Sequence, residues 1–518
     1  MTDKPQTNLY AALRDAFPAA LDGWAIETDA GLIYTWRDLD RGSAMIANEL
    51  AARGLEPGAR LVAQVDKSVE ALMLYLAALR AGLVYVPLNT AYPPAEMAHF
   101  IDNAQPAAVV CTPQHFGWVS KLAFRAGAQV VYTLGTDRQG TLLERAAHRS
   151  DIQSPVPVGM QALASIIYTS GTTGRSKGAM LTHGNLLANA QILRQYWDWR
   201  ADDVLIHVLP IFHVHGLFVA VHGALLNGSP MLWAARFDPR TVLQWLPRAT
   251  VFMGVPTLYT RLLGEPELTP ERCARMRLFI CGSAPLLIDT FRAWQQRTGH
   301  TILERYGMSE TIMLTSNPCG PDVRYGGQDE RRGGTVGFPL PGVELRIADA
   351  ADRPLPAGEV GGVQVRGPSV FQGYWRMPDK TAEDFTADGW FRTGDVGFID
   401  TRGYVTLVGR SKDVLISGGY NVYPAEVEGA INELPGVAES AVIGVPHPEW
   451  GEVGLALVIP QPGATVQPDR VLAALRGRLA SYKIPKRCVV VDELPRNAMG
   501  KVQKNVLRER WRDAAAAS

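Results

Sequence analysis

The strongest constraint on the fold is an alternation of helix-like segments with short apolar runs between residues 40 and 160. There "SAMIANELAARGL" precedes "ARLVAQV", "SVEALMLYLAALRAGL" precedes "VYVPLN", and "MAHFIDNAQ" precedes "AAVVCT". The rhythm returns over residues 200–310, where "DVLIHVLP", "TVFMGVP" and "MRLFICGS" are the apolar runs. Such alternation predicts crossover units in mainly parallel sheets covered by helices.

Near residue 330 the sequence pattern changes. In "GGTVGFPLPGVELRIADAADRPLPAG", short segments of alternating polarity, typical of strands, are separated by Gly and Pro. The last hundred residues read as two helices among short strands, and a chain of 518 residues exceeds the size of one core. We therefore expect an α/β protein with a large N-terminal domain of helix-covered sheets at 1–409. A small β-barrel subdomain would occupy about 330–409, and a small mobile α+β C-terminal domain would span 410–518.

Composition excludes several classes of protein. Lys plus Arg and Asp plus Glu both number 51, so nothing indicates nucleic acid or an anionic membrane as a partner. The five cysteines are far apart and lack metal-ligand spacing, which argues against disulfides and zinc. No apolar leader and no long apolar run is visible, so the sequence predicts a soluble, cytoplasmic protein. It does not indicate an oligomeric state.

One short stretch indicates a phosphate site. "YTSGTTGRSKGAML", at 168–181, brings hydroxyls, glycines and two cations together. Backbone N–H groups and hydroxyls in such a loop suit phosphate oxygens, although many loops of this composition bind nothing. The spacing is not that of a Walker A loop, because Lys177 comes three residues after Gly174.

Six further stretches decide what this loop belongs to: "PIFHVHGL", "GSAPL", "ERYGMSET", "GWFRTGDVG", "GRSKDVLISGGYNVYPAEVE" and "LPRNAMGKVQK". In order and spacing they resemble the core motifs of the adenylate-forming superfamily of acyl-CoA synthetases, luciferases and adenylation domains. The resemblance covers about residues 30–510. It implies that a carboxylate attacks the α-phosphate of ATP, giving an acyl adenylate and pyrophosphate, and that a thiol then takes the acyl group.

The resemblance also implies the residues of the ATP site. Tyr306 would face the adenine, Glu310 would bind Mg²⁺, and Asp395 would accept the ribose hydroxyls. The whole expected ATP site comprises Thr169, Ser170, Gly171, Thr172, Thr173, Gly174, Lys177, Ser283, Ala284, Pro285, Glu304, Arg305, Tyr306, Gly307, Met308, Ser309, Asp395 and Arg410.

Two half-reactions are implied as well. Lys501 of "NAMGKVQK" would contact the acyl carboxylate and the α-phosphate during adenylation, with Glu310 and His213 as the other catalytic residues. The C-terminal domain would then rotate about Lys412 and present Gly418, Gly419 and Tyr420 to CoA.

The acid is the hardest part to predict. Within the superfamily the chain looks closest to enzymes that activate malonate, and a dicarboxylate needs a cation or several donors at its second charge. Arg277 and His215 are the first candidates, although Arg277 could equally form a structural ion pair. Methylmalonate, a short monoacid, and a medium-chain or aromatic acid remain alternatives. An inactive nucleotide sensor is disfavoured because Lys501, Glu310 and Asp395 are all present.

Overall fold

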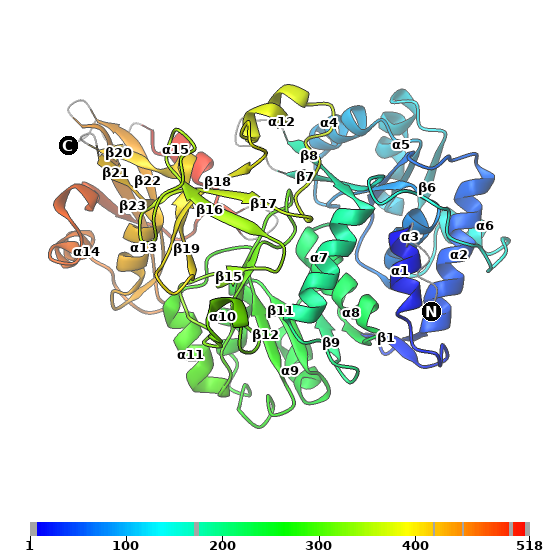
Figure 1. Ribbon diagram of the computed structural model, residues 1–518, viewed down its shortest axis with the longest axis horizontal. Coiled ribbons are helices and arrows are strands. Elements are labelled where there is room, and N and C mark those ends of the chain that lie inside the picture. The colour runs from blue at the N-terminus through cyan, green and yellow to red at the C-terminus, as the bar shows by residue number, and fades with distance from the viewer. Residues whose placement is uncertain (1–7, 170–175, 418–419, 448–449, 497–500, 513–518) are drawn as a thin grey trace.

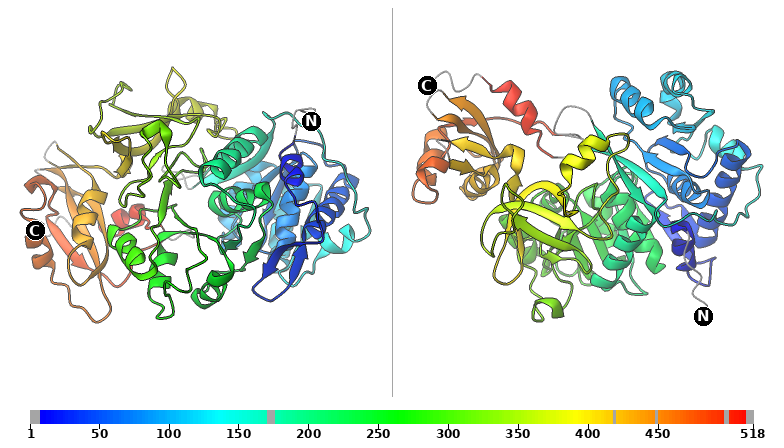
Figure 2. Two further views of the ribbon diagram at one scale, coloured as in Figure 1. Left: turned by 60° about the horizontal axis from the view of Figure 1, so that its bottom comes forward. Right: turned by 45° about the horizontal axis from the view of Figure 1, so that its top comes forward.

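The computed structural model describes residues 8–169, 176–417, 420–447, 450–496 and 501–512. Figures 1 and 2 show the N-terminal helices, in blue, at one end of the molecule and the C-terminal sheet, in orange, at the other. The strands drawn in green lie between them.

Among the described residues no helix is long and apolar enough to cross a membrane. The cellular location stays a prediction.

Two large sheets carry the N-terminal part. The nine-stranded sheet has the order β15 (Phe338–Pro339), β14 (Thr315–Ser316), β13 (Leu303–Tyr306), β12 (Leu278–Cys281), β11 (Val251–Gly254), β9 (Leu205–His207), β10 (Met231–Trp233), β1 (Trp24–Thr28), β2 (Ile33–Thr35). The six-stranded sheet has the order β6 (Val130–Thr133), β5 (Ala108–Cys111), β3 (Arg60–Gln64), β4 (Val84–Pro87), β7 (Leu163–Thr169), β8 (Lys177–Thr182). Pairing is parallel in both except at β2, β14, β15 and β8.

Helices cover both faces of these sheets, as the alternating pattern predicts. They are α1 (Leu9–Asp15), α2 (Trp36–Ala52), α3 (Val69–Arg80), α4 (Pro94–Ala104), α5 (Phe116–Arg125), α6 (Thr141–Ala146), α7 (His183–Tyr196), α8 (His222–Asn227), α9 (Pro239–Trp245), α10 (Pro256–Leu263) and α11 (Ile288–Thr298). The largest apolar cluster joins α3, α7 and α8 to the facing strands of both sheets. Every residue of α3 is buried, which fits its almost wholly apolar sequence.

The β-rich segment forms a four-stranded antiparallel sheet in the order β16 (Glu344–Ala348), β17 (Gly361–Arg366), β18 (Phe391–Ile399), β19 (Val405–Arg410), and α12 (Pro378–Asp384) lies between β17 and β18 in the chain. In the described chain no pairing joins β16 to β19, so the expected barrel is instead an open sheet. Four strands are half the number that encloses a side-chain-filled interior.

The C-terminal segment has its own sheet and its own cores. Its elements are β20 (Leu415–Ser417), β21 (Tyr420–Val422), α13 (Pro424–Asn432), β22 (Val437–His447), β23 (Gly451–Pro460), α14 (Pro468–Leu475), β24 (Arg487–Val490) and α15 (Lys504–Arg510). The α/β class with a large N-terminal part and a small C-terminal domain is thus confirmed. The exact boundary at 409 stays a prediction.

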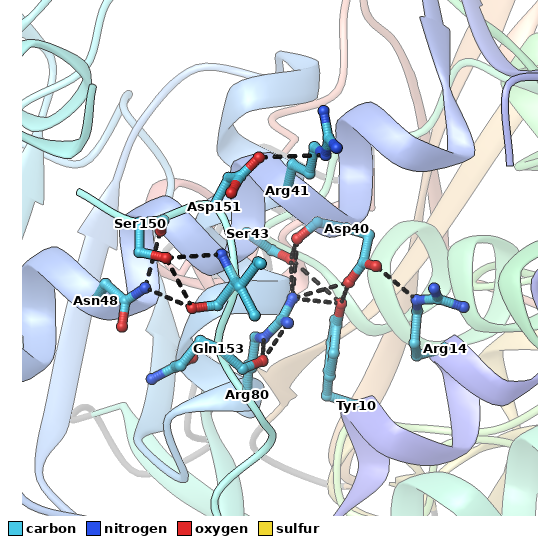
Figure 3. Close-up of polar contacts among 11 residues, drawn as sticks. Tyr10, Arg14, Asp40, Arg41, Ser43, Asn48, Arg80, Ser150, Asp151 and Gln153 are labelled. Carbon is cyan, nitrogen blue, oxygen red and sulfur yellow. Dashed lines mark hydrogen bonds and ion pairs between the residues drawn. The ribbon is translucent and has the colours of Figure 1, made fainter. Parts of the chain in front are cut away.

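A buried polar cluster joins the first three helices (Figure 3). Arg80, at the end of α3, is 6% exposed. Its Nη1 donates to Tyr10 Oη at 2.8 Å, Asp40 Oδ1 at 2.9 Å and Ser43 Oγ at 3.2 Å, and its Nε and Nη2 donate to the Gln153 carbonyl. All three nitrogens of this guanidinium therefore have partners, which is what a buried charge requires.

Candidate active site

The candidate site begins at the carboxyl ends of β12 and β13, where parallel sheets bind ligands. β12 ends at Cys281 and runs into Gly282, Ser283, Ala284 and Pro285. Ser283 has a φ of 73°, a left-handed conformation that is costly for a residue with a side chain. The expected Ser283–Pro285 turn thus lies at this edge of the sheet.

β13 carries three predicted residues, Glu304, Arg305 and Tyr306. The Tyr306 hydroxyl donates to Asp395 Oδ2, and Asp395 Oδ1 pairs with Arg410 Nε at 2.7 Å. Asp395 and Arg410 face each other across β18 and β19. The structure therefore brings together the three residues expected at adenine and ribose.

Glu304, also on β13, has a buried carboxyl group whose hydrogen bonding is incomplete in the described chain. Its Oε1 accepts from the Leu286 N–H at 3.3 Å, while in the described chain its buried Oε2 has no hydrogen-bond partner. Burial raises the pKa of Glu304 to about 8. A donor on a bound ligand, such as an amino group, would complete its hydrogen bonding.

The turn after β13 carries Glu310. Gly307 permits the turn, because a Cβ there would lie 1.9 Å from the Ile312 carbonyl oxygen, and Met308 and Ser309 lie half-buried between Gly307 and Glu310. Glu310 is buried, burial raises its pKa, and its Oε1 accepts from Tyr374 Oη at 3.1 Å.

Two residues of the predicted phosphate loop are described. Thr169 ends β7 and Lys177 begins β8, so both flank the loop on neighbouring antiparallel strands. The Lys177 ammonium lies 3.4 Å from Asp384 Oδ2 and 4.2 Å from the Tyr374 ring centroid. Five predicted members, Ser170, Gly171, Thr172, Thr173 and Gly174, lie outside the described residues.

His215 begins a π-helix that spans His215–Val221, and His213 lies just before it. π-helical segments occur often at functional sites. His215 Nδ1 lies 3.3 Å from Ser283 Oγ, whereas its buried Nε2 has no partner among the described residues. Burial, together with the charges of Lys501 and Arg305, lowers the pKa of His213 to about 3, and burial also lowers the pKa of His215. Both imidazoles are therefore neutral at pH 7.

Arg305 is a buried cation whose hydrogen bonding is incomplete. It is 2% exposed, and within the described chain its Nε and Nη2 have no hydrogen-bond partner. The register of β12 and β13 sets Gly282 beside it, and a Cβ on Gly282 would lie 2.6 Å from Arg305 Cζ. Burial lowers the pKa of Arg305 to about 10, so it stays charged at pH 7. The ATP contact expected of Arg305 stays a prediction. Burial lowers the pKa of His213 and His215, and the charge of this guanidinium adds to that shift.

Arg277 lies elsewhere. It precedes β12 at the amino end of the strand, about 20 Å along the chain from Ser283 at roughly 3.3 Å per residue. Its Nη2 pairs with Asp203 Oδ2 at 2.5 Å, and its Nη1 donates to the Trp197 carbonyl at 3.0 Å. The expected substrate contact was therefore misplaced, because one strand length separates the two ends of a sheet. Arg277 forms the structural ion pair that was the alternative.

Lys501 reaches the site from the C-terminal domain. Although it keeps contact with solvent, desolvation lowers its pKa, and the charges of Arg410 and Arg305 lower it further. Lys412 is exposed at the end of β19, and its pKa is lowered by partial desolvation. Of the expected CoA residues, Gly418, Gly419 and the Tyr420 side chain lie outside the described part of the chain. The hinge and CoA assignments stay predictions.

The residues fit Mg²⁺ only in partnership with phosphates. The described residues contain no group of three or more acidic, His or Cys side chains that could hold a metal. Glu310 offers one buried carboxylate, and Tyr374 contacts both this group and Lys177 at the start of β8. Mg²⁺ commonly binds through one or two carboxylates together with substrate phosphates and water, so this donor set suits a magnesium–nucleotide complex.

Comparison with known proteins decides the family. The AMP-binding enzyme model matches residues 16–375, and the model of the AMP-binding enzyme C-terminal domain matches 426–501. The chain belongs to the AMP-binding enzyme family. It is 37% identical to a feruloyl-CoA synthase of Amycolatopsis, over 93% of this chain and 94% of that one. It is 35% identical to the malonate–CoA ligase of Mus musculus, over 92% and 86%.

Structural comparison agrees. ATP-bound MatB from Rhodopseudomonas palustris superposes with a TM-score of 0.94 at 51% identity, over 98% of this chain and 99% of that one. This AMP-binding enzyme is accordingly a CoA ligase, with ATP and CoA as its implied substrates.

Sequence reasoning overlooked two residues of this cluster, Tyr374 and Asp384, and did not anticipate that Arg305 would be buried with two nitrogens unpaired in the described chain. The sequence did carry a signal for the direction of Arg305. Neighbours in a strand point to opposite faces, so Arg305 must face away from the side shared by Glu304 and Tyr306. No local signal marks Tyr374 or Asp384, which come more than sixty residues after Glu310.

Proposed function

We propose that this CoA ligase activates malonate, and methylmalonate less readily, to an acyl adenylate and transfers the acyl group to CoA, releasing AMP and diphosphate. The supporting observation is Arg305, a buried cation whose Nε and Nη2 lack partners in the described chain. A buried unpaired charge is costly, and an anionic ligand with two oxygens removes that cost. The second carboxylate of a dicarboxylate is such a ligand.

Arg305 orients the acid so that its other carboxylate faces the α-phosphate. The neutral imidazoles of His213 and His215 donate or accept hydrogen bonds beside it without adding charge. Lys501 stabilises the negative charge that develops on the carboxylate and the α-phosphate, and Asp395 holds the ribose. Lys177 meets the terminal phosphates.

Glu310 would hold Mg²⁺, which when bound neutralises charge on the departing diphosphate. The C-terminal domain then turns about Lys412, and Gly418, Gly419 and Tyr420 admit the thiol of CoA. The thiol attacks the acyl carbon, the bond to AMP breaks, and a thioester forms.

The alternative is an aromatic or medium-chain carboxylate–CoA ligase, which the resemblance to feruloyl-CoA synthase favours. AMP release with malonate, methylmalonate, acetate, octanoate, benzoate and ferulate separates the two. We expect malonate to give the highest kcat/KM. A higher value for octanoate, benzoate or ferulate would reject the malonate assignment.

The variant Arg305→Gln tests whether this arginine binds the second carboxylate. We expect it to abolish the preference for malonate over acetate and to leave acetate turnover unchanged. Arg277→Gln is the matched control and should keep that preference. Equal loss for every acid in the Arg305 variant would contradict the role of this side chain.

A further inference from the structure

Tyr374 lies between the two groups expected to meet the phosphate end of ATP. Its hydroxyl is 3.1 Å from Glu310 Oε1, and its ring centroid is 4.2 Å from Lys177 Nζ. Glu310 follows a strand of the nine-stranded sheet, whereas Lys177 begins a strand of the six-stranded sheet. Tyr374 therefore bridges two parts of the fold that the chain separates by more than a hundred residues.

The hydroxyl of Tyr374 acts as a donor. Burial raises its pKa, and the carboxylates of Glu310 and Asp384 raise it further, so the phenol stays protonated. A hydrogen bond from a neutral donor fixes one oxygen of Glu310 and leaves the carboxylate charged. The other oxygen stays available for a cation.

The ring of Tyr374 acts on Lys177. A buried ammonium needs a favourable electrostatic partner, and an aromatic face supplies one without neutralising the charge. Asp384 also lies within 3.4 Å of this ammonium, but its other oxygen is 2.9 Å from Lys380 Nζ. Asp384 is thus shared between two cations. A bound phosphate can therefore replace Asp384 as the partner of the Lys177 ammonium, which remains over the ring.

We propose that Tyr374 is a positioning residue for ATP, holding Glu310 through its hydroxyl and Lys177 through its ring. The hydroxyl sets the gain in nucleotide affinity that Mg²⁺ provides. The ring sets the affinity for the polyphosphate itself. This inference rests on the ATP site and is independent of the identity of the acid.

Calorimetric binding of ATP without any acid tests both roles, because no adenylate can form. We expect Tyr374→Phe to shrink the Mg²⁺-dependent gain in affinity about 3- to 10-fold, while the affinity measured with a chelator stays within about twofold. Tyr374→Leu removes the ring as well, and should also weaken metal-free binding about 3- to 10-fold.

Tyr132→Phe is the matched control, because Tyr132 donates to the buried carboxylate of Glu49 at 2.7 Å in another part of the molecule. It should lower the melting temperature about as much as Tyr374→Phe and leave both ATP affinities unchanged. The proposal is overturned if Tyr374→Phe alters metal-free and metal-dependent binding equally or alters neither. It is also overturned if Tyr132→Phe reproduces the effect.

Discussion

Two buried arginines of this protein differ in their hydrogen bonding. Arg80 joins three helices, and its Nε, Nη1 and Nη2 all donate to oxygen atoms. Arg305 is equally buried, yet two of its three nitrogens have no partner in the described chain. A cation whose donors are all used stabilises the fold, whereas one left incomplete lowers stability and keeps binding capacity for an anion. Burial alone therefore does not separate structural from functional charges.

Arg305→Gln should have the largest effect on function. We expect kcat/KM for malonate to fall about 1,000-fold, roughly 4 kcal/mol, because an anion then enters the pocket without its counter-charge. The melting temperature should stay the same or rise, because the variant removes an incompletely paired charge. AMP release and thermal melting measure the two outcomes, and a fall in both would make Arg305 a structural residue like Arg80.

Arg80→Met should show the opposite pattern. Loss of the cation leaves Asp40 and the Gln153 carbonyl without their partner, so the free energy of unfolding should fall by about 3 kcal/mol. The value is at the low end of the range for buried pairs because Arg14 still pairs with Asp40 at 2.8 Å. Denaturant unfolding measures the loss. KM for malonate of the folded variant should match the wild type, and a raised KM would break the comparison.

The pKa values of two buried carboxyl groups shift in opposite directions: Asp40, which pairs with Arg80, and Glu304, which precedes Arg305 in the chain. Burial alone would raise the pKa of Asp40, but hydrogen bonds from Tyr10 and Arg14 lower it overall, so its stabilisation is present above its usual pKa and is lost in acid. Burial raises the pKa of Glu304 from 4.5 to about 8, so folding is favoured by the protonated form and stability falls as pH rises through this window.

Glu304→Gln should therefore flatten the pH dependence of stability between pH 5 and 8, by up to about 1.4 kcal/mol per pH unit. Denaturant unfolding at several pH values in this range measures the slope. Asp40→Asn is the control, since it should change stability without flattening this window. An unchanged slope in the Glu304 variant would mean that this carboxyl group is ionised in the folded protein.

Gly282→Ala should have the smallest effect. Its Cβ would meet Arg305 Cζ at 2.6 Å and displace the guanidinium. We expect KM for malonate to rise about 10-fold, roughly 1.4 kcal/mol, with little change in the KM for ATP. Steady-state kinetics measure both. A larger rise for ATP than for malonate would assign Arg305 to the nucleotide, as the sequence alone suggested.

Several residues predicted for the ATP site lie together in the structure, because short continuous motifs carry them. Tyr306 ends β13, Glu310 lies in the turn that follows, and Asp395 and Arg410 lie on adjacent strands, so local order in the chain carries their positions. The position of Arg277 was not predictable in this way. Arg277 is only six residues from Ser283, yet a strand places these two residues at opposite ends of the sheet.

The sequence by itself determined the layered α/β fold and carries the motif of the expected phosphate loop, because apolar periodicity and a Gly/Ser/Thr-rich stretch are local properties of the chain. Tertiary structure alone decided which arginine is paired and which is left incomplete, and which tyrosine joins Lys177 to Glu310. The physical reason is that the partners of a buried charge come from segments distant in the chain. Whether its donors are satisfied becomes defined only when those segments pack together.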